Sequence, residues 1–557
     1  MSQATAQNIP LSFYEEKSAY PGIFAWIFST DHKRIGLLYM FTILSFFLFG
    51  MSMGFLIRLE KMFPGGQFFQ PATYNALFTI HGVVMIFLFV IPGIPAVFGN
   101  FILPIQLGAE DVAFPRLNLL SWWLLVIGAL VIFLSLFTGS KLPDTGWTFY
   151  APYNTITTAN IPMAVFGAFL VGFSSILTGL NFITTVHRLR AKGMTFFRMP
   201  LFAWSIYATA WIQILATPVV GITLLLVIAE RFLGVGVFNP SKSGDPLMYQ
   251  HLFWIYSHPA VYIMVLPAMG IVSDIIPTFC KKPIFGYKAI AFSSMSIAFI
   301  GYLVWGHHMF TSGMADLARV VFSFLTFFVA VPTAIKIFNW TATLYKGSIE
   351  LRAPMLFALS FIFLFSIGGL TGVMLGTLNL DLHLHDTSFV VAHFHYTIFG
   401  GFGFALFGGI HYWFPKMFGK MYNETRAKWA WLLLFIGFNM TYFPLFLAGL
   451  EGMPRRYYDY LPKFAPYHFW STIGSWIMIS GILFMFGNLL HGLLRGEKAD
   501  DNPWGGSTLE WQVPSPPPLV NFTTPPVVNK DPYDFSDILK KRNSSPTPQD
   551  QEDKGGQ

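Results

Sequence analysis

The chain has 557 residues, of which 54% are hydrophobic, 18% aromatic and only 11% charged. A soluble globular protein carries roughly 25% charged residues, so this chain cannot cover its surface with ionised groups, and lipid is the solvent that suits it. The single cysteine, Cys280, excludes a disulfide framework and a thiolate metal cluster, and the modest net charge of +7 gives no indication of nucleic-acid binding.

Apolar segments dominate the chain between its two polar ends. Residues 1–30 contain no basic stretch followed by an apolar one, so no signal peptide is predicted, and residues 1–35 are expected to form a cytoplasmic N-terminal segment. A membrane-spanning helix needs about 20 mostly apolar residues, and such segments predict an all-α integral membrane domain over residues 36–498. The twelve predicted spans are 36–57, 75–103, 119–139, 161–184, 203–229, 251–276, 287–310, 320–344, 355–378, 389–415, 430–449 and 469–494.

The loop charges predict the orientation of this twelve-helix bundle. Lys and Arg gather in the loops on the side of the N-terminus, for example at Arg188, Arg190 and Lys192. The positive-inside rule then places both termini in the cytoplasm. Residues 499–557 are rich in proline and polar residues, which predicts a cytoplasmic tail without a hydrophobic core.

Six of the fourteen histidines lie inside or at the rim of predicted spans. One such histidine alone is more often a hydrogen-bonded core residue than a ligand, but six in otherwise apolar helices indicate metal sites. Imidazole suits iron, copper and zinc, and the shortage of buried carboxylates disfavours a hard cation. The six are His81, His258, His307, His308, His393 and His395.

The spacing of two of these histidines predicts two separate centres. His393 and His395 lie two residues apart in VVAHFHY, so on a helix they point about 200° apart. They cannot ligate one metal from one regular helix, but they can ligate two centres on opposite sides of it. His81, in TIHGVVMIF, is the candidate second axial ligand for one of these centres.

The other three histidines predict a site with three nitrogen ligands. His258 and Tyr262 are four residues apart in YSHPAVY and share a helix face. His307 and His308 are adjacent in WGHHMF, so they bind one ion only if their side chains converge, which distortion near a helix end allows. Three imidazoles with an open coordination position suit copper or catalytic zinc.

Lys336, in FFVAVPTAIKIFNW, is the one Lys or Arg that lies away from a loop or a helix end in the predicted spans. A snorkelling lysine is one interpretation. Thr333 lies three residues earlier on the same helix face, which favours a polar track through the membrane.

Together these residues resemble subunit I of the heme–copper terminal oxidases, in the large branch that includes cytochrome c oxidase. The resemblance covers about residues 20–520. It implies reduction of oxygen to water with electrons from cytochrome c, proton translocation, and a multi-pass location in a bacterial inner membrane. The motifs, in family order, are TIHGVVMIF, GAEDVAFPRLN, WIYSHPAVYIMVLP, VWGHHMF, VPTAIKIFNW, HDTSFVVAHFHY and MPRRYYDY.

The resemblance assigns three histidines to two hemes. His81 and His395 match the axial ligands of the low-spin heme a, and His393 matches the proximal ligand of the high-spin heme a3. One histidine ligand leaves the other face of that iron open for oxygen. Arg58 matches the arginine that contacts the formyl group of heme a. Residues expected near the heme propionates are Arg455, Arg456 and Trp147.

The remaining histidines match the copper site of the family. His258, His307 and His308 resemble the ligands of the copper ion CuB. Tyr262 matches the tyrosine that the family cross-links covalently to the histidine four residues before it, and the i,i+4 spacing permits this bond. Such a phenol can supply one electron and one proton when the O–O bond is split.

Further metals and partners follow from the same resemblance. His385 and Asp386 match a magnesium or manganese site, and Glu60 matches a peripheral calcium site. A dinuclear copper site needs cysteines that this chain lacks. A partner subunit II carrying that site would therefore receive the electrons from cytochrome c, with subunit III and small subunits as further partners.

Two polar tracks resemble the proton pathways of the family. The lysine pathway would contain Lys336, Thr333, Ser273 and Tyr262. An ordinary loop carboxylate is the alternative interpretation of Asp111. The aspartate pathway would contain Asp111, Asn100, Asn118, Ser174, Ser175 and Asn181.

The YSHPAVY motif departs from the commonest pattern of the family. Ala260 stands where most members carry a buried glutamate, and Tyr256 and Ser257 precede His258 as in a subgroup with a YSHP signature. The Tyr256 hydroxyl could hold an internal water chain where the carboxylate would have been. A phenol with a pKa of about 10 relays protons more readily than it stores one as an anion.

Four alternative functions make different predictions. A quinol oxidase would carry charged and polar residues near the first two spans, where this chain has Ser45, Gly50, Thr73 and Ala76. A nitric oxide reductase would use a non-heme iron with intramembrane glutamate and would lack an equivalent of Tyr262. A twelve-span solute transporter fits the hydropathy equally well but predicts no heme absorption. A purely structural subunit is disfavoured by the six histidines.

Overall fold

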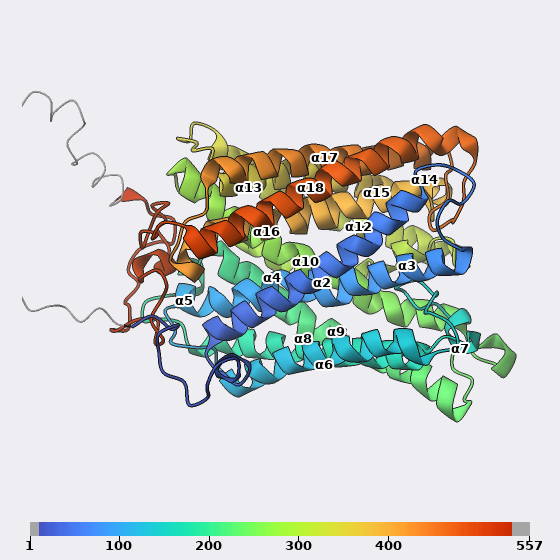
Figure 1. Cartoon of the computed structure of the whole chain (residues 1–557), viewed down its shortest axis with the longest axis horizontal. Coiled ribbons are helices and arrows are strands. Elements are labelled where there is room, and N and C mark those ends of the chain that lie inside the picture. Colours follow the sequence, from blue (N-terminus) through green and yellow to red (C-terminus); the bar gives the residue numbers. More distant parts are fainter. Residues whose placement is uncertain (1–10, 537–557) are drawn as a thin grey trace, which may run out of the picture.

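The structure is a computed structural model that describes residues 11–536. Long helices run side by side along the longest dimension of the molecule (Figure 1). Within residues 11–536 the only β pairing consists of isolated bridges, such as the one between Thr387 and Pro454. The prediction of an all-α membrane protein is therefore confirmed.

The long helices correspond closely to the predicted spans. They are α2 (His32–Glu60), α3 with its π-helical continuation (Pro71–Gly99), α6 (Pro115–Thr138), α8 (Ile161–Arg188), α9 (Leu201–Leu233), α10 (Pro246–Cys280), α12 (Asp316–Leu344), α13 (Ala353–Gly376), α15 with α16 (Ser388–Phe418), α17 (Glu424–Leu450) and α18 (Ala465–Arg495). Shorter helices are α1 (Phe24–Ile27), α4 (Ile91–Ile94), α5 (Leu103–Leu107), α7 (Tyr153–Ile156), α11 (Tyr287–Ile300) and α14 (Leu378–Leu384).

One predicted span is shorter in the structure. Within the described residues, eleven helices are long and apolar enough to cross a membrane, and the apolar helix Tyr287–Leu303 is shorter. The segment predicted as 287–310 leaves the α-helical path after Ile300, and 3-10 turns follow to Met309. A Cβ on Gly301 would lie 2.7 Å from the ring of Tyr262, so this turn packs directly on α10. The count of twelve spans and the cytoplasmic side of the termini stay predictions.

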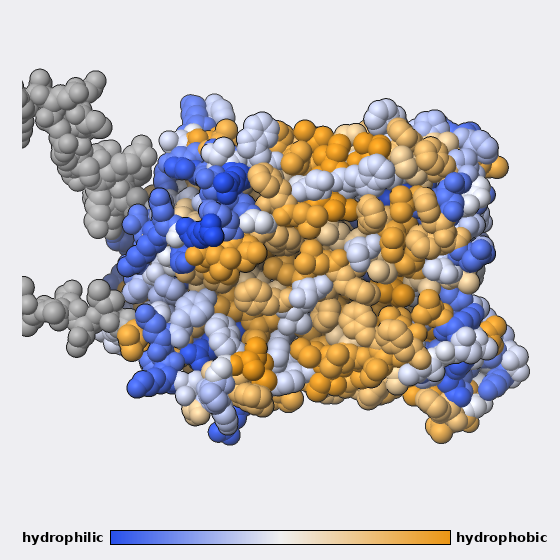
Figure 2. Space-filling view, viewed as in Figure 1, coloured by the Kyte–Doolittle hydropathy of each residue, from blue (hydrophilic) through white to orange (hydrophobic). Residues whose placement is uncertain are grey.

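The surface matches an environment of lipid. Figure 2 shows apolar side chains across the middle of the molecule and hydrophilic residues at the two ends of its long axis. Large apolar side chains are exposed along the helices, and Leu130 within α6 keeps 57% of its surface accessible. Prolines interrupt several helices, for example Pro259 and Pro267 in α10, as membrane helices allow when neighbouring groups satisfy the freed backbone.

The C-terminal segment differs from its prediction. Residues 499–536 lie across one end of the helix bundle (Figure 1), and the side chains of Trp504, Trp511 and Tyr533 are buried there. The prediction of a tail without a core is wrong for this part, because aromatic residues spaced between the prolines pack onto the helix ends. Residues 537–557 of the predicted tail lie outside the described residues.

Candidate metal centres around one buried cavity

A cavity of about 1020 Å³ lies between the helices, and all six histidines predicted as ligands line it. Drug-sized pockets measure roughly 300–1000 Å³, so this space is at the upper end of that range and can hold large groups. Glycines form part of its wall. A Cβ on Gly54 would lie 3.1 Å from the ring of His81, and one on Gly82 would lie 2.9 Å from Trp147.

His81 in α3 and His395 in α15 each have one ring nitrogen fixed by the backbone. The Nδ1 atom of His81 is 2.8 Å from the carbonyl oxygen of Gly50, and that of His395 is 2.8 Å from the carbonyl of Val391. A carbonyl only accepts hydrogen bonds, so Nδ1 carries the proton and Nε2 keeps its lone pair. Metal-ligating histidines usually have this outer hydrogen bond, which orients the ring.

His393 follows the same rule on the other side of α15. Its Nδ1 atom is 3.1 Å from the hydroxyl oxygen of Thr371, and that hydroxyl donates to the carbonyl of Ile367. The hydroxyl therefore accepts from Nδ1–H, which leaves Nε2 of His393 free for a metal. The donor chemistry of this ring fits a heme iron.

Gly372 in α13 makes room for the ring of His393. A Cβ at this position would lie 2.9 Å from the Cε1 atom of His393. We expect Gly372→Ala to displace the ring, to lower stability by about 1–3 kcal/mol through overpacking, and to reduce the content of high-spin heme. Thermal unfolding measures the stability, and the pyridine hemochrome assay measures the total heme content, which should fall as the high-spin heme is lost.

The matched control for this variant is Gly487→Ala in α18, where an added Cβ would meet no atom within 4 Å. Gly487→Ala should leave the heme content and the unfolding temperature within error of the wild type. Equal heme content in the Gly372→Ala and wild-type proteins would contradict the role of Gly372.

His258, His307 and His308 converge as the sequence predicted. One ligand atom from each of these histidines lies within 4.8 Å of the others. Nδ1 of His258 and Nε2 of His308 are 3.2 Å apart, and Nε2 of His258 is buried without a hydrogen-bond partner in the described residues. Neighbouring imidazoles with an unpartnered nitrogen are a donor set that fits copper.

The surroundings of these three rings restrict their movement. Nδ1 of His307 is 3.0 Å from the hydroxyl of Thr326, which itself donates to a backbone carbonyl. The ring of His308 stacks on Trp254 with centroids 3.8 Å apart. Tyr262 lies beside His258, with ring centroids 4.8 Å apart and an interplanar angle of 67°. The sequence did not indicate Thr326 or Trp254.

Charged groups line one end of the cavity. Arg455 forms an ion pair with Asp386 at 2.9 Å. Arg456 is mostly buried beside it, and burial, with a smaller effect of the Arg455 charge, lowers the pKa of Arg456 to about 10. His385 pairs with Asp381 at 2.8 Å, a carboxylate that no sequence motif indicated. Trp147 and Arg58 line the same cavity.

The residues of the predicted lysine pathway are only partly connected. The Lys336 ammonium is fully buried and donates to the hydroxyl of Ser294 at 2.7 Å. Ser273 accepts a hydrogen bond from Trp340 at 2.9 Å, whereas Thr333 and Tyr262 line the cavity. Within the described residues no direct hydrogen bond joins Lys336 to the other three. Ser294 lies 42 residues before Lys336 in the sequence, and no motif indicated that the two side chains would meet.

The predicted aspartate pathway contains buried polar groups along α6 and α8. Ser174 lies 3.3 Å from the hydroxyl of Tyr39, which also bonds Ser121 at 2.8 Å. Asn181 accepts a hydrogen bond from the backbone N–H of Phe114. Buried polar groups of this kind are commonly bridged by internal water. Polar atoms without a protein partner in residues 11–536 occur in Asn100, Asn118 and Ser175.

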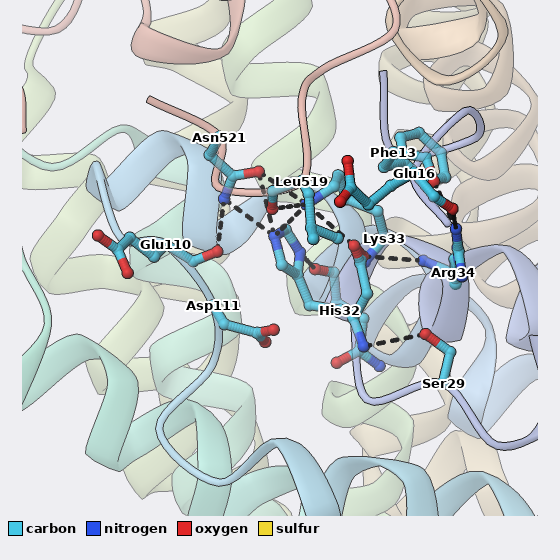
Figure 3. Close-up of polar contacts among 12 residues, drawn as sticks. Phe13, Glu16, Ser29, His32, Lys33, Arg34, Glu110, Asp111, Leu519 and Asn521 are labelled. Carbon is cyan, nitrogen blue, oxygen red and sulfur yellow. Dashed lines mark hydrogen bonds and ion pairs between the residues drawn. The ribbon is translucent and has the colours of Figure 1, made fainter. Parts of the chain in front are cut away.

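Asp111 lies at the start of this track, between α5 and α6. Burial raises the pKa of its carboxyl to about 7, and the nearby Lys33 charge opposes this shift. Figure 3 shows Asn521 of the C-terminal segment between Lys33 and the loop that carries Glu110 and Asp111. The Asn521 amide accepts from Lys33 at 3.0 Å and donates to the carbonyls of Ala109 and Glu110.

Other groups at this mouth were not predicted from the sequence. Nδ1 of His32 lies 2.7 Å from the carbonyl oxygen of Asn100, which connects the mouth to the predicted track. At the same end of the helix bundle, the buried Gln106 amide donates to the carboxylates of Asp274 and Glu510, at 2.8 and 3.0 Å. These contacts join parts of the chain that are far apart in sequence, so no local motif could indicate them.

The YSHPAVY segment, in which Ala260 replaces the usual buried glutamate, faces the cavity with the six histidines. Tyr256, Ser257 and Ala260 all line the cavity. The hydroxyl of Ser257 is buried and has no partner among residues 11–536. This leaves a polar group near His258 with unused hydrogen-bonding capacity.

The chain is similar to known proteins over most of its length. A sequence profile described as Cytochrome C and Quinol oxidase polypeptide I matches residues 34–477. The chain is 47% identical over 509 residues to Cytochrome c oxidase subunit 1 of Synechocystis sp., which covers 91% of this chain and 92% of that protein. It is 44% identical over 548 residues to the protein of the same name from Thermostichus vulcanus, covering 98% and 99%.

A solved structure supports the fold. A heme–copper terminal oxidase dimer studied by cryo-EM aligns with a TM-score of 0.74, 22% identity, and coverage of 84% of this chain and 85% of the other. At this identity the likeness concerns the arrangement of the helices alone.

Proposed function

This chain belongs to the cytochrome c and quinol oxidase polypeptide I family as the catalytic subunit of a heme–copper terminal oxidase, and we propose that its six cavity histidines hold two hemes and a copper ion. The observation that carries the proposal is the presence of all six around one cavity of about 1020 Å³. The family implies the hemes and the copper; their identity as heme a, heme a3 and CuB is part of the proposal.

The histidines divide into three sets in this proposal. His81 and His395 would hold the low-spin heme through Nε2, since their Nδ1 atoms are engaged by backbone carbonyls. His393 would hold the high-spin heme. Copper would be held by His258, His307 and His308. The chemistry these groups supply when bound is electron transfer to oxygen, which four electrons and four protons convert to two molecules of water.

The other residues of the cavity have supporting roles. Arg455, Arg456 and Trp147 would contact the heme propionates, and Arg58 would contact a polar substituent of the low-spin heme. The Tyr262 phenol, beside His258, would deliver a proton and an electron to oxygen. Magnesium or manganese at His385 and Asp386 is proposed from the family. The Glu60 carboxylate accepts three backbone N–H bonds, and a calcium site there is proposed from the family alone.

Two proton routes to the copper site are proposed, and both would start on the cytoplasmic side. Lys336, Thr333 and Ser273 would lead protons to Tyr262. From Asp111, the second route would pass along Asn100, Asn118, Ser174, Ser175 and Asn181. Because Ala260 carries no carboxyl, Tyr256 and Ser257 would hold the water chain at its inner end. Hydroxyl groups can relay a proton in this way without storing charge.

Asp111 provides a test of the second route. Its carboxyl, whose pKa is raised to about 7 by burial, holds a proton below pH 7 and loses it above. We therefore expect wild-type oxygen turnover to fall as the pH rises through about 7. Asp111→Asn should lower turnover at neutral pH by at least about tenfold, because it removes a group that exchanges protons, and should lack this step in its pH profile.

An oxygen electrode between about pH 6 and pH 8.5 gives these profiles. The matched control is Glu110→Gln, which neutralises the exposed carboxylate next to Asp111 and should retain both the turnover and the step. A turnover in Asp111→Asn equal to that of the wild type would exclude this route.

Cytochrome c is the proposed electron donor, through a subunit II with a dinuclear copper site. Subunit III and small subunits are further proposed partners, and the bacterial inner membrane is the proposed location.

Oxygen consumption by the purified assembly should be fast with reduced cytochrome c and slow with quinol, and the reduced protein should show heme absorption. The reverse donor preference would support a quinol oxidase. A lack of iron and copper would refute the proposal.

Proton pumping despite Ala260 is a separate part of the proposal. Oxidase reconstituted in sealed vesicles should acidify the outside medium during turnover with cytochrome c. Turnover without acidification would refute pumping and leave oxygen reduction standing.

A further inference from the structure

His468, near the start of α18, is a buried imidazole without a partner. Only 1% of its surface is exposed, and within residues 11–536 neither ring nitrogen has a hydrogen-bond partner. Its ring packs against Tyr460 with centroids 4.2 Å apart and lines the same cavity as His81 and His395. A buried polar atom left unpaired costs about 1–3 kcal/mol. This cost indicates a hydrogen-bonding partner that the chain itself does not supply.

Lys61, directly after α2, brings a buried cation to the same place. It is 4% exposed, and its ammonium lies over the rings of Tyr74 and Tyr460 at 5.8 and 5.7 Å. In the described part of the chain no carboxylate forms an ion pair with it. The adjacent Glu60 carboxylate is instead engaged by the backbone N–H groups of residues 67–69.

Arg58 adds a second cation one helical turn before Lys61, on the same side of the helix. Its guanidinium donates to the hydroxyl of Ser471 at 2.7 Å. Burial, with a smaller effect of the Arg58 charge, lowers the pKa of Lys61 to about 7, and the Asp459 charge opposes this shift. Buried charges are costly unless an electron-rich group compensates them. All of Arg58, Lys61 and His468 line the cavity.

We propose that Lys61 and His468, together with Arg58, form a binding pocket for an oxygen-bearing substituent, a carboxylate or a carbonyl, on the edge of the planar group held by His81 and His395. The inference rests on the proposed function. The family resemblance brings Arg58 alone to this position. Lys61 and His468 are added by the structure, from chain segments roughly 400 residues apart.

The pocket has a consequence for electron transfer. A positive charge close to a redox group favours its reduced form, and the effect is strong where the dielectric constant is low. Lys61 would therefore raise the midpoint potential of the low-spin heme. A hydrogen bond from His468 to a conjugated carbonyl would also shift the absorption of that heme.

The experiment compares variants of the purified holo-oxidase by spectroelectrochemical titration. Lys61→Met keeps the length of the side chain and removes its charge, so it should lower the midpoint potential of the low-spin heme and shift its reduced α band. Lys61→Arg keeps the positive charge and should retain the wild-type midpoint potential. His468→Phe should shift the reduced α band of the low-spin heme. Lys463→Met, which removes an exposed lysine on the same side, should change neither.

The possible results separate the inference from the function on which it rests. An unchanged potential and band in both Lys61→Met and His468→Phe, with the low-spin heme fully present, would overturn the pocket and leave the oxidase function intact. A wild-type protein without a bis-histidine low-spin heme would overturn both. The potential could instead depend on added chloride or phosphate, and lose that dependence in Lys61→Met. The pocket would then belong to a free anion, which also overturns the inference.

Discussion

His307→Ala is expected to lose the copper ion and nearly all oxygen reduction. His307 is one of three histidines whose ligand atoms lie within 4.8 Å of one another, and its removal leaves two. Even the groups around a metal ligand are worth about 10- to 100-fold in affinity or activity, so we expect loss of a ligand to lower turnover by more than about 100-fold. Metal analysis and oxygen consumption of the purified oxidase measure both effects.

The same variant should retain both hemes, because His81, His393 and His395 are unchanged. Thr326→Val provides the graded control. It removes only the hydroxyl that lies 3.0 Å from Nδ1 of His307, so copper affinity should fall by about tenfold and turnover should fall less than in His307→Ala. A His307→Ala protein with a full complement of copper would refute the assignment of this site.

Tyr262→Phe is expected to stop turnover while leaving every metal in place. The change removes one hydroxyl from a ring that packs beside His258 at 4.8 Å between centroids, and it removes no nitrogen ligand. If the phenol supplies a proton and an electron to oxygen, its loss should lower turnover by about 10²- to 10⁴-fold, the usual range for a positioned proton donor. Steady-state oxygen consumption, with copper and heme contents measured on the same sample, gives the result.

Tyr249→Phe is the control for this prediction. Tyr249 is a buried tyrosine of the same helix, and its hydroxyl donates to the carbonyl of Thr148 at 2.8 Å, away from the cavity histidines. Its variant should lose about 1 kcal/mol of stability with that hydrogen bond and retain turnover. Comparable turnover in Tyr262→Phe and Tyr249→Phe would show that the Tyr262 phenol takes no part in the reaction.

Local patterns in the sequence were sufficient for the helices and for the direction of single side chains. The length of the apolar runs predicted the membrane helices, and the two-residue spacing of His393 and His395 placed them on opposite sides of α15. In the structure these rings have different outer partners, Thr371 for His393 and the Val391 carbonyl for His395. The helical period alone fixes such directions, because each residue advances by about 100°.

Where a helix stops was harder to predict. The span expected over 287–310 becomes non-α-helical after Ile300, although its residues remain apolar. Hydropathy cannot distinguish an apolar helix from an apolar turn that packs on a neighbour. The close contact of Gly301 with Tyr262 depends on where α10 lies, and composition contains no information about that position.

The sequence by itself determined the family, the membrane helices and the histidines that face inward, since each of these follows from local spacing and motifs. Only the tertiary structure showed that Lys61 and His468 pack against the same Tyr460 ring, that Asn521 reaches the mouth beside Asp111, and that aromatic residues of segment 499–536 pack onto the helix ends. These contacts join segments separated by hundreds of residues. Their energies depend on burial and on unpaired polar atoms, and both arise only when distant helices pack together.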